Sequence, residues 1–399
     1  MNKIKTDIIE TFLYKYYLQN VKILKQKNMS CVLHFPKKLS RKDKVVNVEA
    51  DKKMYVIPKL DILLDPASKR ALKFLTKRCF PIRRRNKLLF YFYMFLLGNK
   101  YLEKSIIPEI MYIQGLQKFP GELVFSQHGN KIKIFNFETR VIYNLIINKI
   151  DLLEAEIKAR LNYCHIVNIP KILSYNIEEG WFSEEFIDAF PPNRLDKKIN
   201  ILHLCLPDLI QFYEKNKLEP CKTNEYLNSL LMRLQNDVEN SSIIEKKRFI
   251  QIIENAFDYI NNYNHSKEMK TFITTIHGDL QLDNILFLKE EMRYYLIDWE
   301  YTRKASVLYD IFNFFSLNLL RRNKSPIKEL LIKENKAYKG IFTQFNEVVD
   351  SEISADYLKY HYAIYLLERL CFNFKNKYFG DIERWFVLLD DFVKTIRLS

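Results

Sequence analysis

A short polar segment, HGDLQLDN at residues 277–284, constrains the fold most strongly because it lies between apolar, strand-like segments. TFITTI precedes it, ILFL follows it, and YYLIDWEY comes shortly afterwards. Polar groups at the mouth of a β-hairpin are held by rigid strands and remain reachable by solvent and ligand. We therefore expect a chemical site at this hairpin, with Asp279, Asn284 and Asp298 as its main polar residues.

The hydrophobic pattern divides the chain into three parts. Residues 1–117 form an N-terminal extension that mixes helical stretches with short strands such as KMYVIPKL. Residues 118–188 predict three strands, a helix and two further strands, which is the pattern of a small antiparallel sheet with one helix. From 189 to 399 apolar residues recur at three- and four-residue intervals, which predicts helices. The predicted fold class is α+β, with a small β lobe followed by a large helical lobe.

The residue types in the polar segment suit phosphoryl transfer. This reaction needs a carboxylate that orients the attacking hydroxyl group and oxygen ligands that hold magnesium on the phosphates of a nucleotide. Magnesium prefers hard oxygen donors and keeps several waters, so one carboxylate and one amide oxygen are a sufficient contribution from the protein. Asp279, Asn284 and Asp298 supply such a set.

HGDLQLDN followed by LIDWE resembles the catalytic loop and metal-binding segment of the aminoglycoside phosphotransferase and choline kinase superfamily. The pattern in these relatives of protein kinases is HGDxxxxN, followed by IDWE or IDFE. The resemblance implies a protein-kinase-like two-lobed fold, with ATP and Mg²⁺ as cofactors and a hydroxyl group as acceptor. It implies that Asp279 orients the acceptor hydroxyl, and that Asn284 and Asp298 bind magnesium. His277 and Gly278 would shape the loop.

Asp283 stands where the superfamily often has a small residue. We interpret it as a turn residue, with a contact to a cationic acceptor as the alternative.

In the small lobe, LLEAEIKARL resembles the helix that carries the kinase glutamate. Glu156 has the better register with the apolar positions, and Glu154 is the second candidate. WFSEEFID resembles the hinge, where backbone groups around Glu185 to Ile187 would pair with adenine.

The chain departs from the superfamily on the third strand of this lobe, where Asn144 occupies the position of the phosphate-binding lysine. Lys131 and Lys133 lie two residues apart on the preceding strand and share one face, so either could replace it. The alternatives are Arg140 or Lys149 from a strand end, or a solvated edge face for both lysines. The turn before them has a single glycine, Gly129, instead of a glycine-rich loop.

The composition suggests anionic partners. Lys and Arg number 63 against 48 Asp and Glu, which gives a net charge of +15. Such a charge favours nucleotide phosphates, nucleic acid or an acidic membrane surface without choosing among them. Six scattered cysteines show no metal-ligand spacing, so we expect free thiols, no zinc and a cytoplasmic protein. The N-terminus lacks the pattern of a signal peptide.

Residues 83–97 place a basic cluster beside an aromatic stripe, which favours a buried helix with a solvated basic flank, with peripheral contact with the inner membrane face as the alternative. YVIPKLDILLDPASKRALKFL is similar in layout to phosphotransferase-like proteins encoded with bacterial surface-polysaccharide genes. That likeness implies a sugar or lipid-linked saccharide acceptor.

Three functions compete on the sequence alone. The first is an ATP-dependent kinase for a hydroxyl group of a small molecule or glycan. The second is a pseudokinase or nucleotide-binding scaffold that has lost the strand lysine. Nucleic-acid binding has only the net charge in its favour, and we expect no specific nucleic-acid partner.

Overall fold

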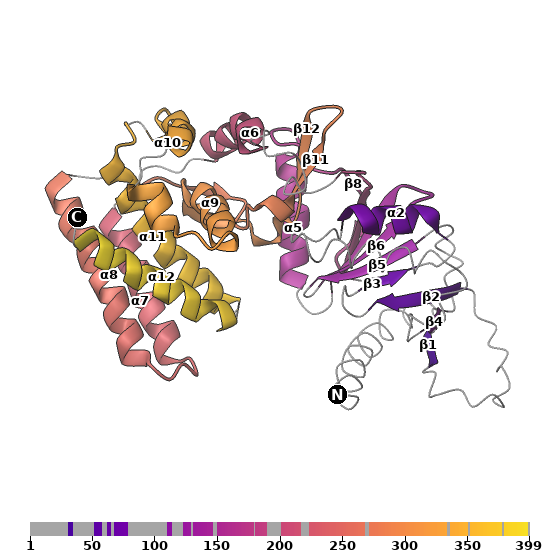
Figure 1. Ribbon diagram of the computed structural model, residues 1–399, viewed down its shortest axis with the longest axis horizontal. Coiled ribbons are helices and arrows are strands. Elements are labelled where there is room, and N and C mark those ends of the chain that lie inside the picture. Colours follow the sequence, from indigo (N-terminus) through magenta and orange to yellow (C-terminus); the bar gives the residue numbers. More distant parts are fainter. Residues whose placement is uncertain are drawn as a thin grey trace. The chain divides into compact units, whose positions relative to one another are not determined.

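The computed structural model describes two compact units of the chain (Figure 1). Unit 1 comprises residues 1–164, 169–196 and 286–295, and unit 2 comprises residues 165–168, 197–285 and 296–399. Within them the described residues are 31–34, 52–57, 62–64, 68–78, 110–113, 123–128, 131–146, 150–178, 180–189, 201–216, 223–267, 271–332, 336–349, 352–376 and 379–397.

Unit 1 is built on one antiparallel sheet whose strands follow the order β1-β4-β2-β3-β5-β6-β7-β9-β8 among the described residues. Its strands are β1 (Cys31–His34), β2 (Lys52–Ile57), β3 (Ile62–Leu64), β4 (Ile110–Ile113), β5 (Leu123–His128), β6 (Lys131–Asn136), β7 (Val141–Ile146), β8 (Ile172–Asn176) and β9 (Trp181–Glu185). The helix α5 (Ile150–Tyr163) connects β7 to β8.

The α+β class and the order of three strands, one helix and two strands are confirmed by β5 to β9 and α5. The sheet is larger than predicted, because β3 pairs with β5 and joins the extension strands to it. An unpaired β5 would expose a row of backbone N–H and C=O groups, and the extension satisfies these groups. The extension therefore continues the sheet of the kinase-like lobe.

The helix α5 buries an apolar side that contributes Leu153 and Ile157 to a core with Ile146 and Phe182 from the sheet. The two sheet residues lie on β7 and β9, which pair directly. This packing fixes which residues of α5 point inward, so it also determines which glutamate of the helix can approach the strands.

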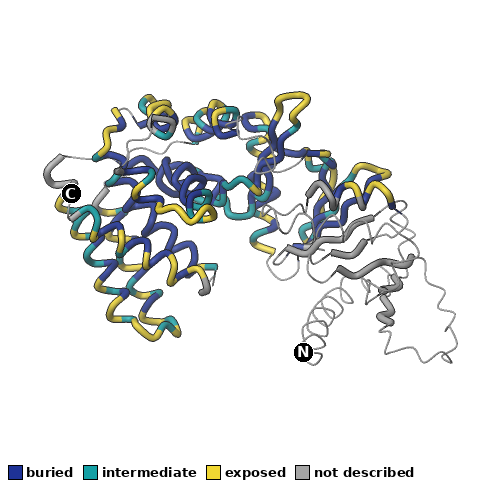
Figure 2. Tube along the Cα trace, in the orientation of Figure 1, coloured by how far each residue is buried: buried dark blue, intermediate teal, exposed yellow. Residues whose placement is uncertain are grey.

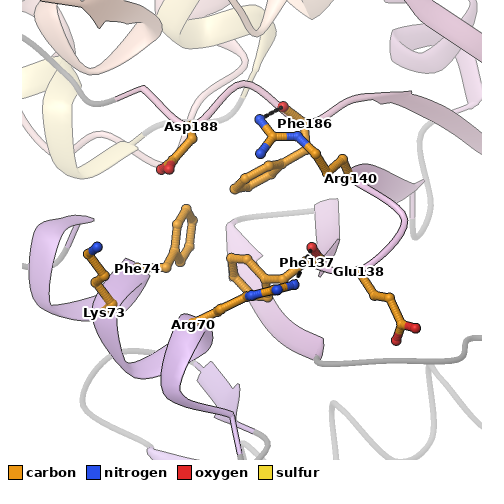
Figure 3. Close-up of a pocket in the computed structure, with 8 residues that line it drawn as sticks. All are labelled: Arg70, Lys73, Phe74, Phe137, Glu138, Arg140, Phe186 and Asp188. Carbon is orange, nitrogen blue, oxygen red and sulfur yellow. Dashed lines mark hydrogen bonds between the residues drawn. The ribbon is translucent and has the colours of Figure 1, made fainter.

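The helix α2 (Lys69–Arg78) adds an aromatic cluster to unit 1 (Figure 3). The Phe74 ring lies 5.2 Å from the ring of Phe137 and 5.9 Å from that of Phe186. These rings and several charged side chains line a cavity of about 450 Å³. Arg70 and Arg140 each donate to a backbone carbonyl beside this cavity. Part of the extension is thus anchored on the kinase-like lobe.

Unit 2 is mostly helical, as predicted. Its helices are α6 (Ile201–Lys215), α7 (Thr223–Glu239), α8 (Lys246–Lys267), α9 (Tyr309–Arg321), α10 (Lys336–Phe342), α11 (Ala355–Lys375) and α12 (Phe379–Arg397), with short turns η4 (Leu282–Asn284), η5 (Trp299–Tyr301), η6 (Lys328–Ile332) and η7 (Thr343–Phe345). The helices α7, α8, α11 and α12 pack as neighbours. Most of α11 is buried (Figure 2), so polar residues such as Glu368 and Arg369 lie inside the unit.

Two short strand pairs surround the polar segment. The strand β10 (Ile273–Ile276) precedes it and pairs with β13 (Arg303–Ser306). The strand β11 (Ile285–Leu288) follows it and pairs with β12 (Arg293–Leu296). The segment therefore connects two strand pairs and ends at the base of the β11–β12 hairpin.

Several predictions concern residues outside the described part of the chain. The basic and aromatic stretch 83–97, the turn glycine Gly129 and the alternative lysine Lys149 all lie there, so the membrane contact stays a prediction. Within the described residues, no helix combines the length and the apolar character needed to cross a membrane. Cys164, Cys205 and Cys371 carry free thiols.

Candidate functional site

The loop that begins the polar segment is held by a buried carboxylate on α9. The backbone N–H groups of His277 and Gly278 donate to the Asp310 carboxylate at 2.7 and 2.9 Å. The hydroxyl of Tyr213, on α6, donates to the same carboxylate at 3.0 Å. All three donors are rigid parts of the fold, so Asp310 fixes the direction in which the chain leaves β10.

The ring of His277 has a structural role, as predicted. It is fully buried, and its Nε2 lies 3.0 Å from the carbonyl oxygen of Ile297. The backbone N–H of Asp279 donates to Nδ1 at 3.3 Å, so Nε2 carries the ring proton and donates to Ile297. His277 therefore connects the loop to the end of β12.

Gly278 is required by its backbone and by its surroundings. Its φ of +86° lies in the left-handed region, where residues with a side chain are strained. A Cβ atom at this position would lie 2.1 Å from the carbonyl oxygen of Tyr301. The loop can follow this path only with glycine here.

The carboxylate of Asp279 is held from two sides. Its Oδ2 accepts from the amides of Gln281 at 2.9 Å and Asn284 at 3.0 Å. Its Oδ1 lies 3.9 Å from Nη1 of Arg369, on α11. Burial raises the pKa of Asp279, and the charge of Arg369 and the two amide hydrogen bonds only partly oppose this rise. The carboxylate is oriented and weakly solvated, which suits a group that orients a hydroxyl.

Asn284 and Asp298 fit a magnesium site. The amide nitrogen of Asn284 donates to the backbone carbonyl of Asp279 at 2.9 Å and to its carboxylate, which leaves the amide oxygen as the possible ligand atom. The N–H of Ile297 donates to the carbonyl of Asn284 at 3.0 Å and thereby brings Asp298 close to Asn284. Asp298 itself has a left-handed backbone, with φ of 61°.

This donor set matches one carboxylate and one amide oxygen, with phosphate oxygens and waters completing the coordination. The described residues contain no group of three or more His, Cys, Asp or Glu side chains arranged for a metal. A site with two protein ligands is compatible with that result.

The position of Asp283 supports its interpretation as a turn residue. It lies in η4, and its carboxylate forms an ion pair with Arg321 at 2.8 Å on the surface of unit 2. Arg321 also donates to the side chain of Gln281 at 2.8 Å. The negative charge of Asp283 is therefore neutralised within the chain.

Three residues that position this loop lie outside the motifs of the sequence. Asp310 and Asn313 are buried on α9, and Asn313 donates to the carbonyl of Leu280 at 3.1 Å. Arg369 lies on the buried helix α11. Polar residues inside the apolar runs VLYDIFNFF and YLLERLCF are the available signal, because a buried charged residue requires a partner.

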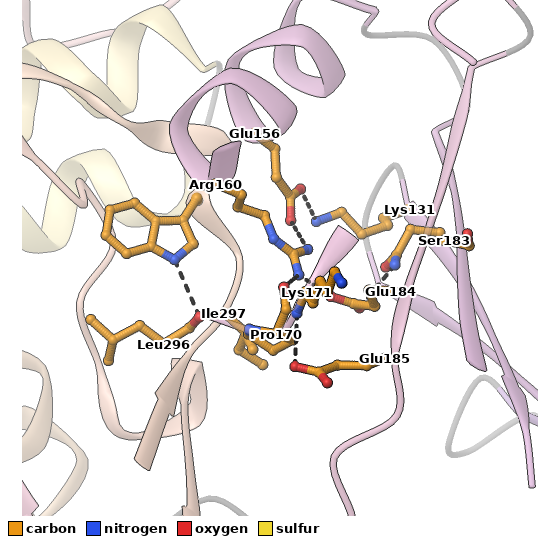
Figure 4. Close-up of polar contacts among 12 residues, drawn as sticks. Lys131, Glu156, Arg160, Pro170, Lys171, Ser183, Glu184, Glu185, Leu296 and Ile297 are labelled. Carbon is orange, nitrogen blue, oxygen red and sulfur yellow. Dashed lines mark hydrogen bonds and ion pairs between the residues drawn. The ribbon is translucent and has the colours of Figure 1, made fainter. Parts of the chain in front are cut away.

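In unit 1, the predicted strand lysine and the predicted helix glutamate come together (Figure 4). The Lys131 ammonium lies 2.7 Å from Glu156 Oε2, and both side chains are buried. Glu154 is exposed, so the structure favours Glu156. Lys131 and Lys133 are 4% and 6% exposed, so the alternative of a solvated edge face is wrong.

A second pair completes this buried network. Arg160 contacts Glu156 Oε1 at 3.4 Å and Glu184 Oε2 at 2.5 Å, and donates to the carbonyl of Pro170 at 2.6 Å. Asn144 donates to Glu184 Oε1 at 2.9 Å. The residue in the usual lysine position therefore supports Glu184, whereas Lys131 pairs with the helix glutamate.

Charges around Glu184 determine its ionisation. Burial alone would raise its pKa, but the charges of Arg160 and Lys133 and the amide of Asn144 outweigh burial, so the pKa lies below 4.5. Lys133 is directly opposite Asn144 in the sheet, on the same face as Lys131. Lys131 thus pairs with Glu156, and the charge of Lys133 acts on Glu184.

At the predicted hinge, the N–H of Glu185 donates to the carbonyl of Lys171 at 3.0 Å, and the N–H of Phe186 donates to the carbonyl of Arg140 at 2.9 Å. These two donors are used within unit 1. Arg140 donates to the carbonyl of Phe186 and lines the cavity beside Phe74 and Phe137. It is therefore not the partner of Glu156.

Comparison with known families confirms the superfamily that the motifs predict. Residues 150–342 match the family model described as Choline/ethanolamine kinase. The matched segment contains α5 with Glu156 and the entire polar segment through Asp298. No curated protein matches the chain.

The solved structures to which this chain is similar include a choline kinase, a choline/ethanolamine kinase family protein and an aminoglycoside phosphotransferase. Choline kinase LicA from Streptococcus pneumoniae shares 17% identity, with a TM-score of 0.43 over 68% of this chain and 90% of that one. A choline/ethanolamine kinase family protein from Mesorhizobium loti shares 13% identity, with a TM-score of 0.46 over 78% and 100%. The aminoglycoside phosphotransferase APH(4)-Ia, in complex with ADP and hygromycin B, shares 11% identity, with a TM-score of 0.46 over 70% and 96%.

Replacing Gly278 by alanine should destabilise unit 2 by about 2–4 kcal/mol, because left-handed strain and overpacking act together. Gly340→Ala is the matched control, since a Cβ atom there meets nothing within 4 Å. Chemical denaturation of both variants checks this. Equal stability of the two variants would contradict the geometry of the loop.

Arg160→Met should destabilise the protein by about 3–5 kcal/mol, because it removes the positive charge between two buried carboxylates. Arg248→Met is the control: Arg248 forms an exposed ion pair with Glu245, and its removal should leave the free energy of unfolding unchanged. Denaturant titrations of both variants give the comparison. A small effect of Arg160→Met would show that the network is solvated.

The same variant should be more sensitive to acid. The pKa of Glu184 is lowered in the folded state. Its ionised form therefore contributes stability that is fully present above about pH 4.5, the ordinary pKa of the group, and is lost as the pH falls through the folded pKa. Arg160→Met removes the strongest charge that lowers this pKa, so its acid-unfolding midpoint should move to higher pH. Circular dichroism against pH measures the midpoint, and Arg248→Met should follow the wild type.

Proposed function

We propose that this chain, whose residues 150–342 match the choline/ethanolamine kinase family, transfers the γ-phosphoryl group of ATP to a hydroxyl group of a small molecule or glycan. The observation that supports this most strongly is the oriented carboxylate of Asp279, whose Oδ2 is held by two amides. A carboxylate with a fixed free side can accept a hydrogen bond from an acceptor hydroxyl and direct its oxygen at phosphorus.

In this proposal Asp298 and the amide oxygen of Asn284 hold Mg²⁺. When bound, the ion neutralises charge on the phosphates of ATP as the γ-phosphoryl group leaves. Asn284 has a second role, because its amide nitrogen fixes Asp279 relative to the metal ligand. The acceptor hydroxyl and the phosphate are thereby positioned by one rigid loop.

Lys131 takes the place of the missing strand lysine. Its ammonium pairs with Glu156, as a phosphate-binding lysine does in the kinase pattern. The pseudokinase alternative rests on Asn144 in the usual position, and the Lys131–Glu156 pair removes most of its support. Lys133 then contributes through Glu184, which its charge helps to keep ionised.

Adenine recognition is proposed at the backbone of the segment that follows β9. The N–H of Glu185 is used inside the sheet, so the proposal narrows to the backbone of Ile187, with Glu185 shaping the hinge through its contacts with Lys171. The functional division remains an extension at 1–117, a nucleotide-binding lobe at 118–188 and a helical lobe at 189–399.

Magnesium-dependent ATP consumption, with water or a pool of sugars as acceptor, tests the proposal. Asp279→Ala, Asp298→Asn and Lys131→Met should each lower turnover at least about 100-fold, because each removes an oriented or charged group from the transition state. Asp391→Asn and Lys158→Ala are matched controls on exposed helix positions and should retain wild-type turnover.

Two outcomes would overturn parts of this assignment. Loss of turnover in Lys133→Met, with retention in Lys131→Met, would transfer the phosphate contact to Lys133. No turnover in the wild type, together with no magnesium-dependent stabilisation by ATP, would favour the pseudokinase.

A further inference from the structure

The aromatic rings around Arg369 and Arg303 in unit 2 already hold positive charges of the chain itself. The Arg369 guanidinium lies 4.9 Å from the centre of the Phe372 ring and 5.3 Å from that of Trp385. The Arg303 guanidinium lies 4.5 Å from Phe372 and 4.5 Å from Tyr309. Aromatic faces are the usual means of binding quaternary ammonium ligands. Here these faces are occupied by guanidinium groups.

Arg369 brings this charge directly to the proposed acceptor position. Its Nη1 is 3.9 Å from Oδ1 of Asp279, and the residue is only 7% exposed. The Oδ2 atom of Asp279 is engaged by two amides, so the side of the carboxylate near Arg369 is the less occupied one. Arg303, the first residue of β13, donates to the carbonyl of Gly278 in this loop at 3.3 Å.

The carboxylates close to this loop are also engaged. Asp310 accepts from the backbone of His277 and Gly278. Glu368 accepts from the backbone and hydroxyl of Ser306, both at 2.6 Å. Asp283 pairs with Arg321. These three carboxylates are directed at partners within the chain, so a cationic acceptor would meet the two guanidinium groups of Arg369 and Arg303.

We propose that Arg369 is a specificity-determining residue that excludes acceptors with a positive charge beside the hydroxyl group. The proposal rests on the proposed function, and it names the acceptor class as an alcohol without such a charge, such as a saccharide. Choline and ethanolamine carry their charge two carbon atoms from the hydroxyl. At about 6 Å and an effective dielectric constant of about 20, repulsion by one guanidinium corresponds to a factor of roughly 100 in affinity.

An isosteric pair of probes tests this. Choline and dimethylbutanol, in which carbon replaces the quaternary nitrogen, have nearly the same shape and differ in charge. A probe that is phosphorylated is compared by its kcat/KM. A probe that is not phosphorylated is compared by its inhibition constant in competition with a sugar that the protein does phosphorylate. The wild type should favour the neutral probe at least about 10-fold.

Variants of Arg369 separate charge from structure. Arg369→Gln should shift the preference towards choline at least about fivefold, whereas Arg369→Lys keeps the charge and should keep the preference. Arg303→Gln provides a second variant, with a smaller shift in the same direction, should Arg369→Gln fail to fold. If Arg369 had a purely structural role, Arg369→Gln would weaken the use or binding of both probes equally. The ratio between choline and dimethylbutanol would then be unchanged, which would overturn the proposal.

Two failures remain distinguishable. A wild type that consumes ATP with an alcohol but prefers choline contradicts the specificity of Arg369 and leaves the kinase function standing. A wild type that consumes ATP with no alcohol contradicts the proposed function itself, and with it the role of Arg369.

Discussion

The buried carboxylate of Asp310 is the interaction on which the catalytic loop depends. It accepts from two consecutive backbone N–H groups and from the hydroxyl of Tyr213. Hydrogen bonds to a charged group contribute about 1.5–3 kcal/mol each, and a buried donor that loses its partner costs a similar amount. Because Gly278 can follow this path only without a side chain, the direction of the loop is fixed by one carboxylate and one glycine. Asp310 and Gly278 together therefore determine the position of Asp279.

The buried network of unit 1 shows how a lysine on a neighbouring strand can place its charge where the usual strand lysine would be. In an antiparallel sheet, directly opposed residues share a face, so Lys131 and Lys133 on β6 lie on the same face as Asn144 on β7. That face is covered by α5, which presents Glu156. A lysine from either strand can therefore meet the glutamate. Arg160 then allows a second carboxylate, Glu184, to be buried beside the first.

Sequence patterns predicted the architecture better than the contacts. The strand and helix order of residues 123–185 follows from local periodicity, and the polar segment follows from residue types at fixed spacing. Whether Lys131 or Lys133 meets Glu156 depends on side-chain direction across two strands and a helix, which periodicity leaves open. The sequence did not predict the pairing of β3 with β5. The strand pattern of the extension and that of the lobe each describe a separate sheet, and the two are joined only by pairing between their edge strands. Arg369 lies within a run of apolar residues, 90 positions from Asp279.

That separation has a physical consequence for the helical unit. The residues that hold the loop come from α6, α9 and α11, and α11 in turn packs against α7 and α12. Arg369 can remain charged in this interior because two aromatic faces and one carboxylate surround it. The aromatic richness of the chain, with 29 Phe and 25 Tyr, thus stabilises buried guanidinium groups as well as apolar packing. The charge next to Asp279 is therefore a property of the helical core, and a change of acceptor class would require repacking of that core together with the loop.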